Sequence, residues 1–97
     1  MNELDFEKQG AYWVSAALSG GESGSLVLNL DLPKSDGVNS PNIIVQSTAG
    51  EDFGWSDRWS TRWGSKVWEQ NVVGIAPFQK VRLLVSVEPY SGQYKAY

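Results

Sequence analysis

Regular alternation of apolar and polar residues constrains the fold of this chain more than any other feature of its sequence. In LVLNLDL, residues 26–32, leucines occupy every second position, and Asn29 and Asp31 lie between them. The segment VRLLVSVE, residues 81–88, repeats the pattern with valine and leucine. Successive side chains of a strand point to opposite faces of a sheet, so both segments predict strands with one buried face.

Three more segments predict strands, at residues 11–18, 42–47 and 66–75. AYWVSAAL, residues 11–18, alternates so that Val14 and Leu18 share one face and Trp13 lies on the other. The other two segments are rich in the β-branched residues that strands favour. Leu4 and Phe6 suggest an N-terminal strand, and EPYSGQ predicts a turn before a short last strand near Tyr94.

Stretches rich in glycine, proline and polar residues separate these segments. SGGESGS, residues 19–25, predicts a hairpin loop, and PKSDGVNSP, residues 33–41, predicts a longer polar loop. The sequence therefore predicts an all-β fold: a small antiparallel β-sandwich or jelly-roll-like domain of six or seven short strands, with residues 1–97 in one domain. The predicted core comprises Val14, Leu28, Leu30, Val45, Leu83, Val85 and Trp68.

A tryptophan repeat interrupts this pattern. WSDRWSTRWGSK, residues 55–66, is a four-residue unit written three times, with a cation three residues after each tryptophan. On a helix the three tryptophans would share one face, with each cation near a ring. On a strand they would share a face with Asp57 and Thr61, and the arginines would lie opposite. Because Gly54 and Gly64 flank the segment, we expect a loop or short helix at residues 54–64.

Several function classes are excluded by composition. The chain has no His and no Cys, which removes the commonest general base, thiol nucleophiles and most zinc sites. We therefore expect no enzymatic activity, no metal and no cofactor. The net charge of −3 argues against nucleic-acid binding, and no apolar run is long enough to span a membrane. Residues 1–10 lack the apolar core of a signal peptide, so we expect a cytoplasmic location, or an extracellular one if a signal peptide has been removed.

The remaining hypothesis is a non-catalytic binding module. The stretch SAALSGGESGSLVLNLDLP resembles a strand–glycine loop–strand piece of jelly-roll carbohydrate-binding modules, but it covers about a fifth of the chain and identifies no family. We expect the repeat to bind a glycan, with Trp59 at the centre and Arg58 and Arg62 as polar anchors. The alternative is a protein partner that uses the same patch, as in a phage or bacterial inhibitor, an immunity protein or a virion component. The oligomeric state stays open. The predicted site comprises Trp55, Arg58, Trp59, Arg62 and Trp63.

Overall fold

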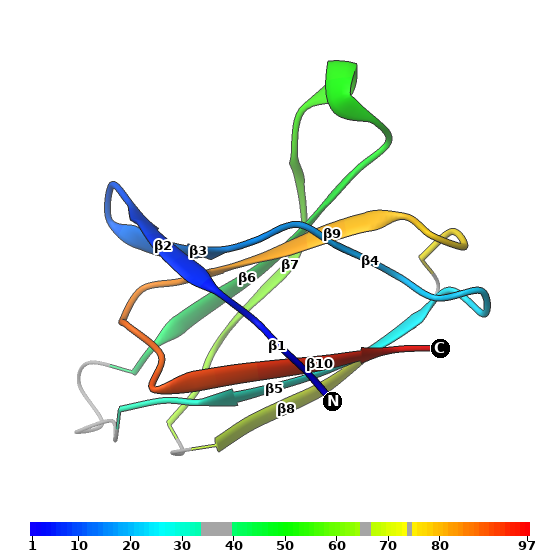
Figure 1. Cartoon of the computed structure of the whole chain (residues 1–97). Helices are drawn as coiled ribbons and strands as arrows, with labels where there is room; N and C mark the ends of the chain where they lie inside the picture. Colours follow the sequence, from blue (N-terminus) through cyan, green and yellow to red (C-terminus); the bar gives the residue numbers. More distant parts are fainter. Residues whose placement is uncertain (34–39, 65–66, 74) are drawn as a thin grey trace.

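Two antiparallel sheets pack face to face in the computed structural model, which describes residues 1–33, 40–64, 67–73 and 75–97 (Figure 1). This arrangement confirms the predicted all-β fold and is consistent with a small β-sandwich. The first sheet has the order β1-β10-β5-β8. Its strands are β1 (Asn2–Glu3), β10 (Ser91–Ala96), β5 (Ser25–Asp31) and β8 (Val67–Val73).

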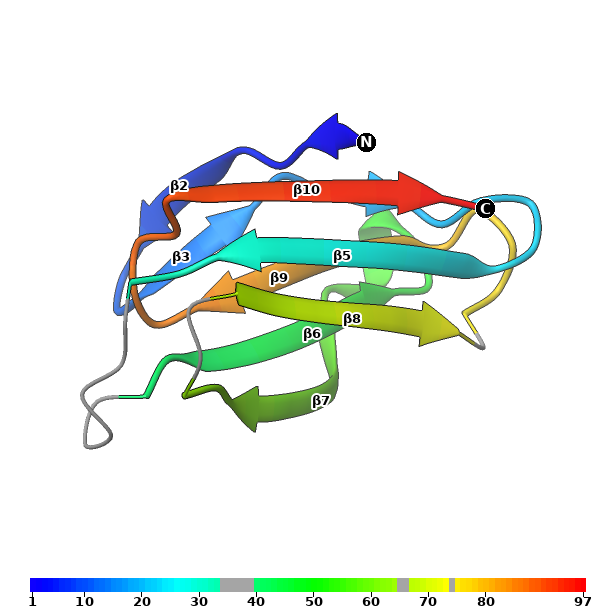
Figure 2. The same ribbon diagram turned by 90° about the horizontal axis from the view of Figure 1, so that it is seen from below.

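The second sheet has the order β2-β3-β9-β6-β7, and the short strand β4 pairs with β9 beyond the end of β3. Figure 2 shows β5, β8 and β10 in one layer, and β3, β9, β6 and β7 in the other. Strands β7 and β8 are therefore edge strands of opposite sheets. The strands of the second sheet are β2 (Phe6–Gln9), β3 (Tyr12–Ser15), β4 (Leu18–Ser19), β6 (Asn42–Thr48), β7 (Ser56–Arg62) and β9 (Lys80–Val85).

The alternating segments supply the core between the sheets. Every second residue of β5 is fully buried, and so are Ile43 and Val45 of β6. The leucines of β5 face the inward side chains of β6 and β9, and all of them belong to one apolar cluster. Each predicted core residue is buried, and Trp68 is only 1% exposed. All of them except Val14 belong to the apolar cluster between the sheets, so alternation marks the buried face correctly for the other six residues.

Three predictions about connections and strands are wrong. The described residues form ten strands rather than six or seven, because short pieces such as β1 and β4 count separately. SGGESGS is no hairpin loop, because β4 pairs in one sheet and β5 in the other, so this segment crosses between the layers. The predicted loop or short helix at residues 54–64 is mostly strand β7. Among the described residues, the helical structure is a single 3₁₀ turn, η1 (Glu51–Phe53), at the tip of the β6–β7 connection. Most of the predicted polar loop, residues 34–39, lies outside the described residues.

The predicted shared face of Val14 and Leu18 is also wrong, because an extra residue lies between β3 and β4. Val14 is opposite Leu84, whereas Leu18 is opposite Val81. The four residues from Val14 to Leu18 thus match only three residues of β9, from Leu84 to Val81. The extra residue turns the Val14 and Leu18 side chains to opposite faces of the sheet. The hydroxyl of the buried Ser15 accepts a hydrogen bond from the backbone N–H of Leu83 at 2.8 Å. This bond satisfies a donor within the sheet where the ladder is interrupted.

Candidate binding site at the tryptophan repeat

A β-bulge divides the tryptophan repeat between the two faces of its sheet. Trp59 is opposite Val45, but Asp57 is opposite Gln46, so Arg58 is an extra residue on β7. Directly opposed residues share a face, and Val45 is buried between the sheets. Trp59 therefore faces the interior, and Asp57 faces outward with Gln46. An unbroken strand would have put Trp59 and Asp57 on the same face.

The inward half of the repeat forms one wall of a cavity between the edge strands. Trp59 and Trp63 are half-buried and pack against the apolar core. The ring centroids of Trp59 and Trp68 lie 5.9 Å apart with their planes tilted by 45°, a favourable geometry for an aromatic pair. We name this space, about 380 Å³ in volume, the edge cavity. Its lining residues are Trp59, Thr61, Trp63, Trp68 and Gln70.

The backbone holds the walls of the edge cavity in place. The indole N–H of Trp63 donates to the carbonyl of Val67 at 2.6 Å, and its backbone N–H donates to the carbonyl of Pro41 at 3.0 Å. The Trp63 ring is thereby tied to the first residue of β8 across the connection between the two edge strands. Such a ring loses little conformational freedom when a ligand binds, which lowers the cost of binding.

The edge cavity contains polar groups but no charged ones. Thr61 shares a face with Trp59 by strand periodicity, and Gln70 is opposite the buried Leu28 on β5. Their hydroxyl and amide groups are therefore the polar part of an otherwise aromatic lining. Hydrogen-bonding groups set among aromatic rings suit an uncharged ligand that has both a flat apolar face and hydroxyl groups.

The two arginines of the predicted site do not line this cavity. Arg62 is opposite Asn42, in the outward row of the sheet, and it is exposed. Arg58 is the extra residue of the bulge and is exposed as well. The structure thus brings together Trp59 and Trp63 from the predicted set, and it separates them from both cations. Lys66, the cation of the third repeat, lies outside the described residues.

Trp55, the remaining predicted residue, lies on the outward face, where its side chain contacts Arg82. Arg82 is linked in turn to Gln46 and Asp57 by hydrogen bonds. The guanidinium carbon of Arg82 lies 4.6 Å from the centre of the Trp55 ring, within range of a cation–π interaction. Arg82 donates to the Gln46 amide oxygen at 2.7 Å, and the Gln46 amide nitrogen donates to Asp57 at 2.7 Å. Partial burial lowers the pKa of Arg82 from its usual value, but a guanidinium stays charged at neutral pH.

Sequence reasoning missed the contributions of Thr61, Trp68 and Gln70 to a cavity. The signal was present, since Trp68 and Gln70 are two residues apart on a predicted strand and must share a face. What the sequence lacked was the adjacency of β7 and β8. These are edge strands of different sheets, and no local pattern shows that their inward faces meet.

Comparison with known proteins finds no matching family model, no similar curated protein and no similar solved structure. The described residues contain no group of acidic, histidine or cysteine side chains arranged to hold a metal ion. In the same part of the chain, no helix is long and apolar enough to cross a membrane. The geometry of the tryptophan repeat is therefore the feature of the molecule that bears on its function.

Proposed function

We propose that this protein is a non-catalytic module that binds a neutral glycan in the edge cavity. The observation that supports the proposal is the lining itself: three tryptophans with a threonine hydroxyl and a glutamine amide, and no charged side chain. The face of a sugar ring carries C–H groups that pack well on an indole ring, whose own face is electron-rich. The hydroxyl groups at the edge of the sugar need hydrogen-bond partners, and the Thr61 hydroxyl and the Gln70 amide in the lining are groups of that kind.

The size of the edge cavity restricts the ligand. Its volume of about 380 Å³ is near the lower end of the range for small-molecule sites. The edge strands β7 and β8 lie on the same side of the sandwich (Figure 2), and a longer chain would extend beyond the cavity along them. We therefore expect the protein to hold a short unit within a longer oligosaccharide.

The proposal is tested by measuring saccharide binding with a pair of matched variants. The wild-type protein is first applied to an array of neutral oligosaccharides, and the best ligand is then titrated calorimetrically. Gln70→Ala is expected to weaken binding about threefold to tenfold, the usual worth of one hydrogen bond. Gln93→Ala is the control, because Gln93 is an exposed glutamine on β10 of the same sheet and lies opposite Asn29, on the outward face.

Two results would contradict the proposal. The first is that the protein binds no saccharide on the array. The second is that the Gln70→Ala and Gln93→Ala proteins bind the ligand with equal affinity, because binding would then occur away from the edge cavity. Thermal melts of both variants show whether either change disturbs folding, which we do not expect at exposed positions.

A protein partner is the second candidate, and one observation favours it. Arg58 and Arg62 are both exposed on an edge strand and point away from the edge cavity. Arginine is enriched among the residues that dominate protein interfaces. Under this alternative, affinity for the partner falls when Arg62 is replaced by alanine and is unchanged in Gln70→Ala. The opposite dependence is expected for glycan binding.

A further inference from the structure

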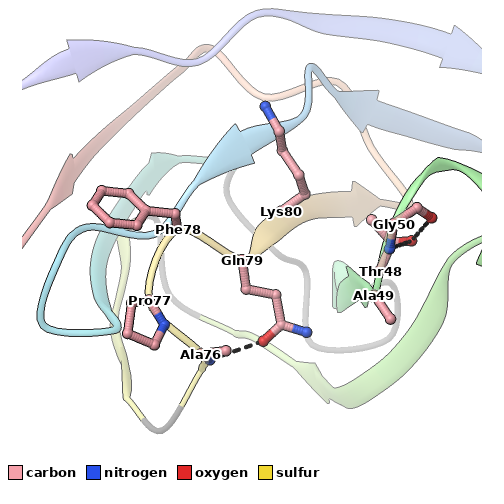
Figure 3. A pocket seen from close by; sticks show the side chains of 8 residues that line it. All are labelled: Thr48, Ala49, Gly50, Ala76, Pro77, Phe78, Gln79 and Lys80. Atoms are coloured by element: carbon pink, nitrogen blue, oxygen red, sulfur yellow. Dashed lines mark hydrogen bonds between the residues drawn. The ribbon is translucent and has the colours of Figure 1, made fainter.

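A second hollow lies on the outward side of the sheet that contains β7. A cavity of about 570 Å³ is lined by residues of the β6–β7 connection, by Trp55 and by Lys80 of β9. A neighbouring cavity of about 430 Å³ shares Thr48, Gly50 and Lys80 with it, so the two adjoin. We call the two together the outer cavity; Figure 3 shows the smaller one, with residues 76–79 on one side, residues 48–50 on the other, and the Lys80 side chain extending upward from the start of β9.

The walls of the outer cavity are ordered by local hydrogen bonds. The Thr48 hydroxyl donates to the carbonyl of Gly50 at 2.7 Å and accepts from its N–H at 3.2 Å, which fixes the start of the connection. On the other side, the Gln79 amide oxygen accepts from the backbone N–H of Ala76 at 3.0 Å (Figure 3). Both walls are therefore fixed by hydrogen bonds within the protein itself.

Trp55 brings an oriented aromatic ring to this space. Arg82 lies against the ring, and its side chain is held in turn by Gln46. Gln46 also binds Asp57, so the only carboxylate in this chain of contacts already has a hydrogen-bond partner. The ring of Trp55 thus has a fixed cation beside it and lines the outer cavity at the same time.

The lining of the outer cavity includes a cation and no anion. No Asp or Glu lines either part of it among the described residues. Lys80 is exposed and has no ion pair with a described side chain, and Arg82 lies two residues along the same face of β9. The chain as a whole has a net charge of −3, and Lys80 and Arg82 lie on the same outward face as the Asp57 carboxylate, which does not line the cavity.

Phe78 marks the same region by an unusual backbone. Pro77 and Phe78 occupy the centre of a turn closed by the N–H of Gln79, which donates to Ala76 at 3.0 Å. Phe78 has a φ of 59°, a conformation that normally favours glycine, and its ring is 64% exposed. Strain of this kind is often retained at binding sites. In Figure 3 the ring projects away from Thr48, so it borders the outer cavity without filling it.

From these features we infer that the outer cavity is a second saccharide site, and that it takes an anionic sugar residue. The Trp55 ring packs against the sugar face, and Lys80 binds its carboxylate, with the Arg82 charge close by. This inference shares with the proposed function the premise that the ligand is a saccharide. The two sites differ in the charge of their lining, so they select different sugars.

The test uses a galacturonate trisaccharide and the same trisaccharide with its carboxyl groups reduced to neutral alcohols. Calorimetry is done with the wild-type protein, Lys80→Gln and Lys8→Gln. Lys8 is the matched control, because it is an exposed lysine on β2 of the same sheet. The wild-type protein is expected to bind the acidic trisaccharide at least about tenfold more tightly than the reduced one, as for one charge-assisted hydrogen bond.

Lys80→Gln should remove that preference, and Lys8→Gln should keep it. Raising the salt concentration should weaken binding of the acidic trisaccharide by the wild-type protein, because salt screens exposed charges. Absence of binding, equal affinity for the two trisaccharides, or equal effects of the two lysine variants would each overturn the inference. Neutral saccharides that bind while the acidic trisaccharide does not would leave the edge-cavity proposal standing and refute only this second site.

Discussion

At the scale of single residues, a glycine sets how closely one terminal segment can pack on the sheet. Gly92 of β10 is buried, and a Cβ atom there would lie 2.9 Å from the Phe6 ring, 3.0 Å from Leu30 and 3.2 Å from Leu4. These neighbours belong to or pack against the core, so they have little space into which to move.

Gly92→Ala should therefore destabilise the protein by about 1–3 kcal/mol, the usual cost of overfilling a packed site. Gly64→Ala is the control, since no atom lies within 4 Å of a Cβ placed there and its backbone φ is not positive. Its effect should stay within about 0.5 kcal/mol. Urea unfolding, monitored by tryptophan fluorescence, measures the stability of both variants. Equal unfolding midpoints would show that the neighbours of Gly92 move aside for the added methyl group at no cost.

At the scale of strands, the bulge at Arg58 holds one extra residue without changing the faces that its neighbours occupy. Arg58→Ala keeps the extra residue and should change the free energy of unfolding by no more than about 0.5 kcal/mol, because Arg58 is exposed. Deleting Arg58 leaves Trp59 opposite Val45 and Asp57 opposite Gln46, now as direct neighbours on a regular strand, so both side chains keep their faces. We expect the deletion to cost no more than about 1 kcal/mol.

The same unfolding measurement tests both changes at Arg58. A deletion that costs several kcal/mol would mean that β7 does not pair with β6 as described, with Trp59 opposite Val45 and Asp57 opposite Gln46. That result would remove the structural reason for placing Trp55 and Trp59 in different sites.

How far the sequence could predict this molecule depends on which residues are considered. Alternation in LVLNLDL and VRLLVSVE identified buried faces correctly, because periodicity is a local property of a strand. The same rule failed at Val14 and Leu18, where one extra residue reversed the faces. For the tryptophan repeat, the strand alternative correctly places Trp59 and Thr61 on one face, but the bulge puts Trp55 on the opposite face from Trp59. Bulges arise from pairing with a partner strand, so a single segment shows no sign of them.

At the scale of the whole molecule, most strand pairings join distant parts of the chain, the exceptions being β2 with β3 and β6 with β7. Asn2 is opposite Tyr94, and β5 in the first third pairs with both β10 and β8. Loops of such length must close before the core can form, which slows folding.

We therefore expect refolding on a timescale of milliseconds to seconds, as for other all-β domains. Stopped-flow fluorescence reports it through Trp68, which passes from water to a site only 1% exposed. Refolding complete within microseconds would mean that local structure, and not the distant pairing of strands, limits the rate.

The four-residue period of the tryptophan repeat has an evolutionary consequence. Four is an even number, so an in-frame duplication of one unit within β7 would lengthen the strand without reversing the faces of the existing tryptophans. Each such duplication would add another ring to the row that contains Trp59 and Trp63. Gain or loss of a single codon in the regular part of the strand would instead transfer residues from one face to the other. Related genes can therefore vary in the number of units with little penalty, whereas gains or losses of one codon between Trp59 and Arg62 should be removed by selection.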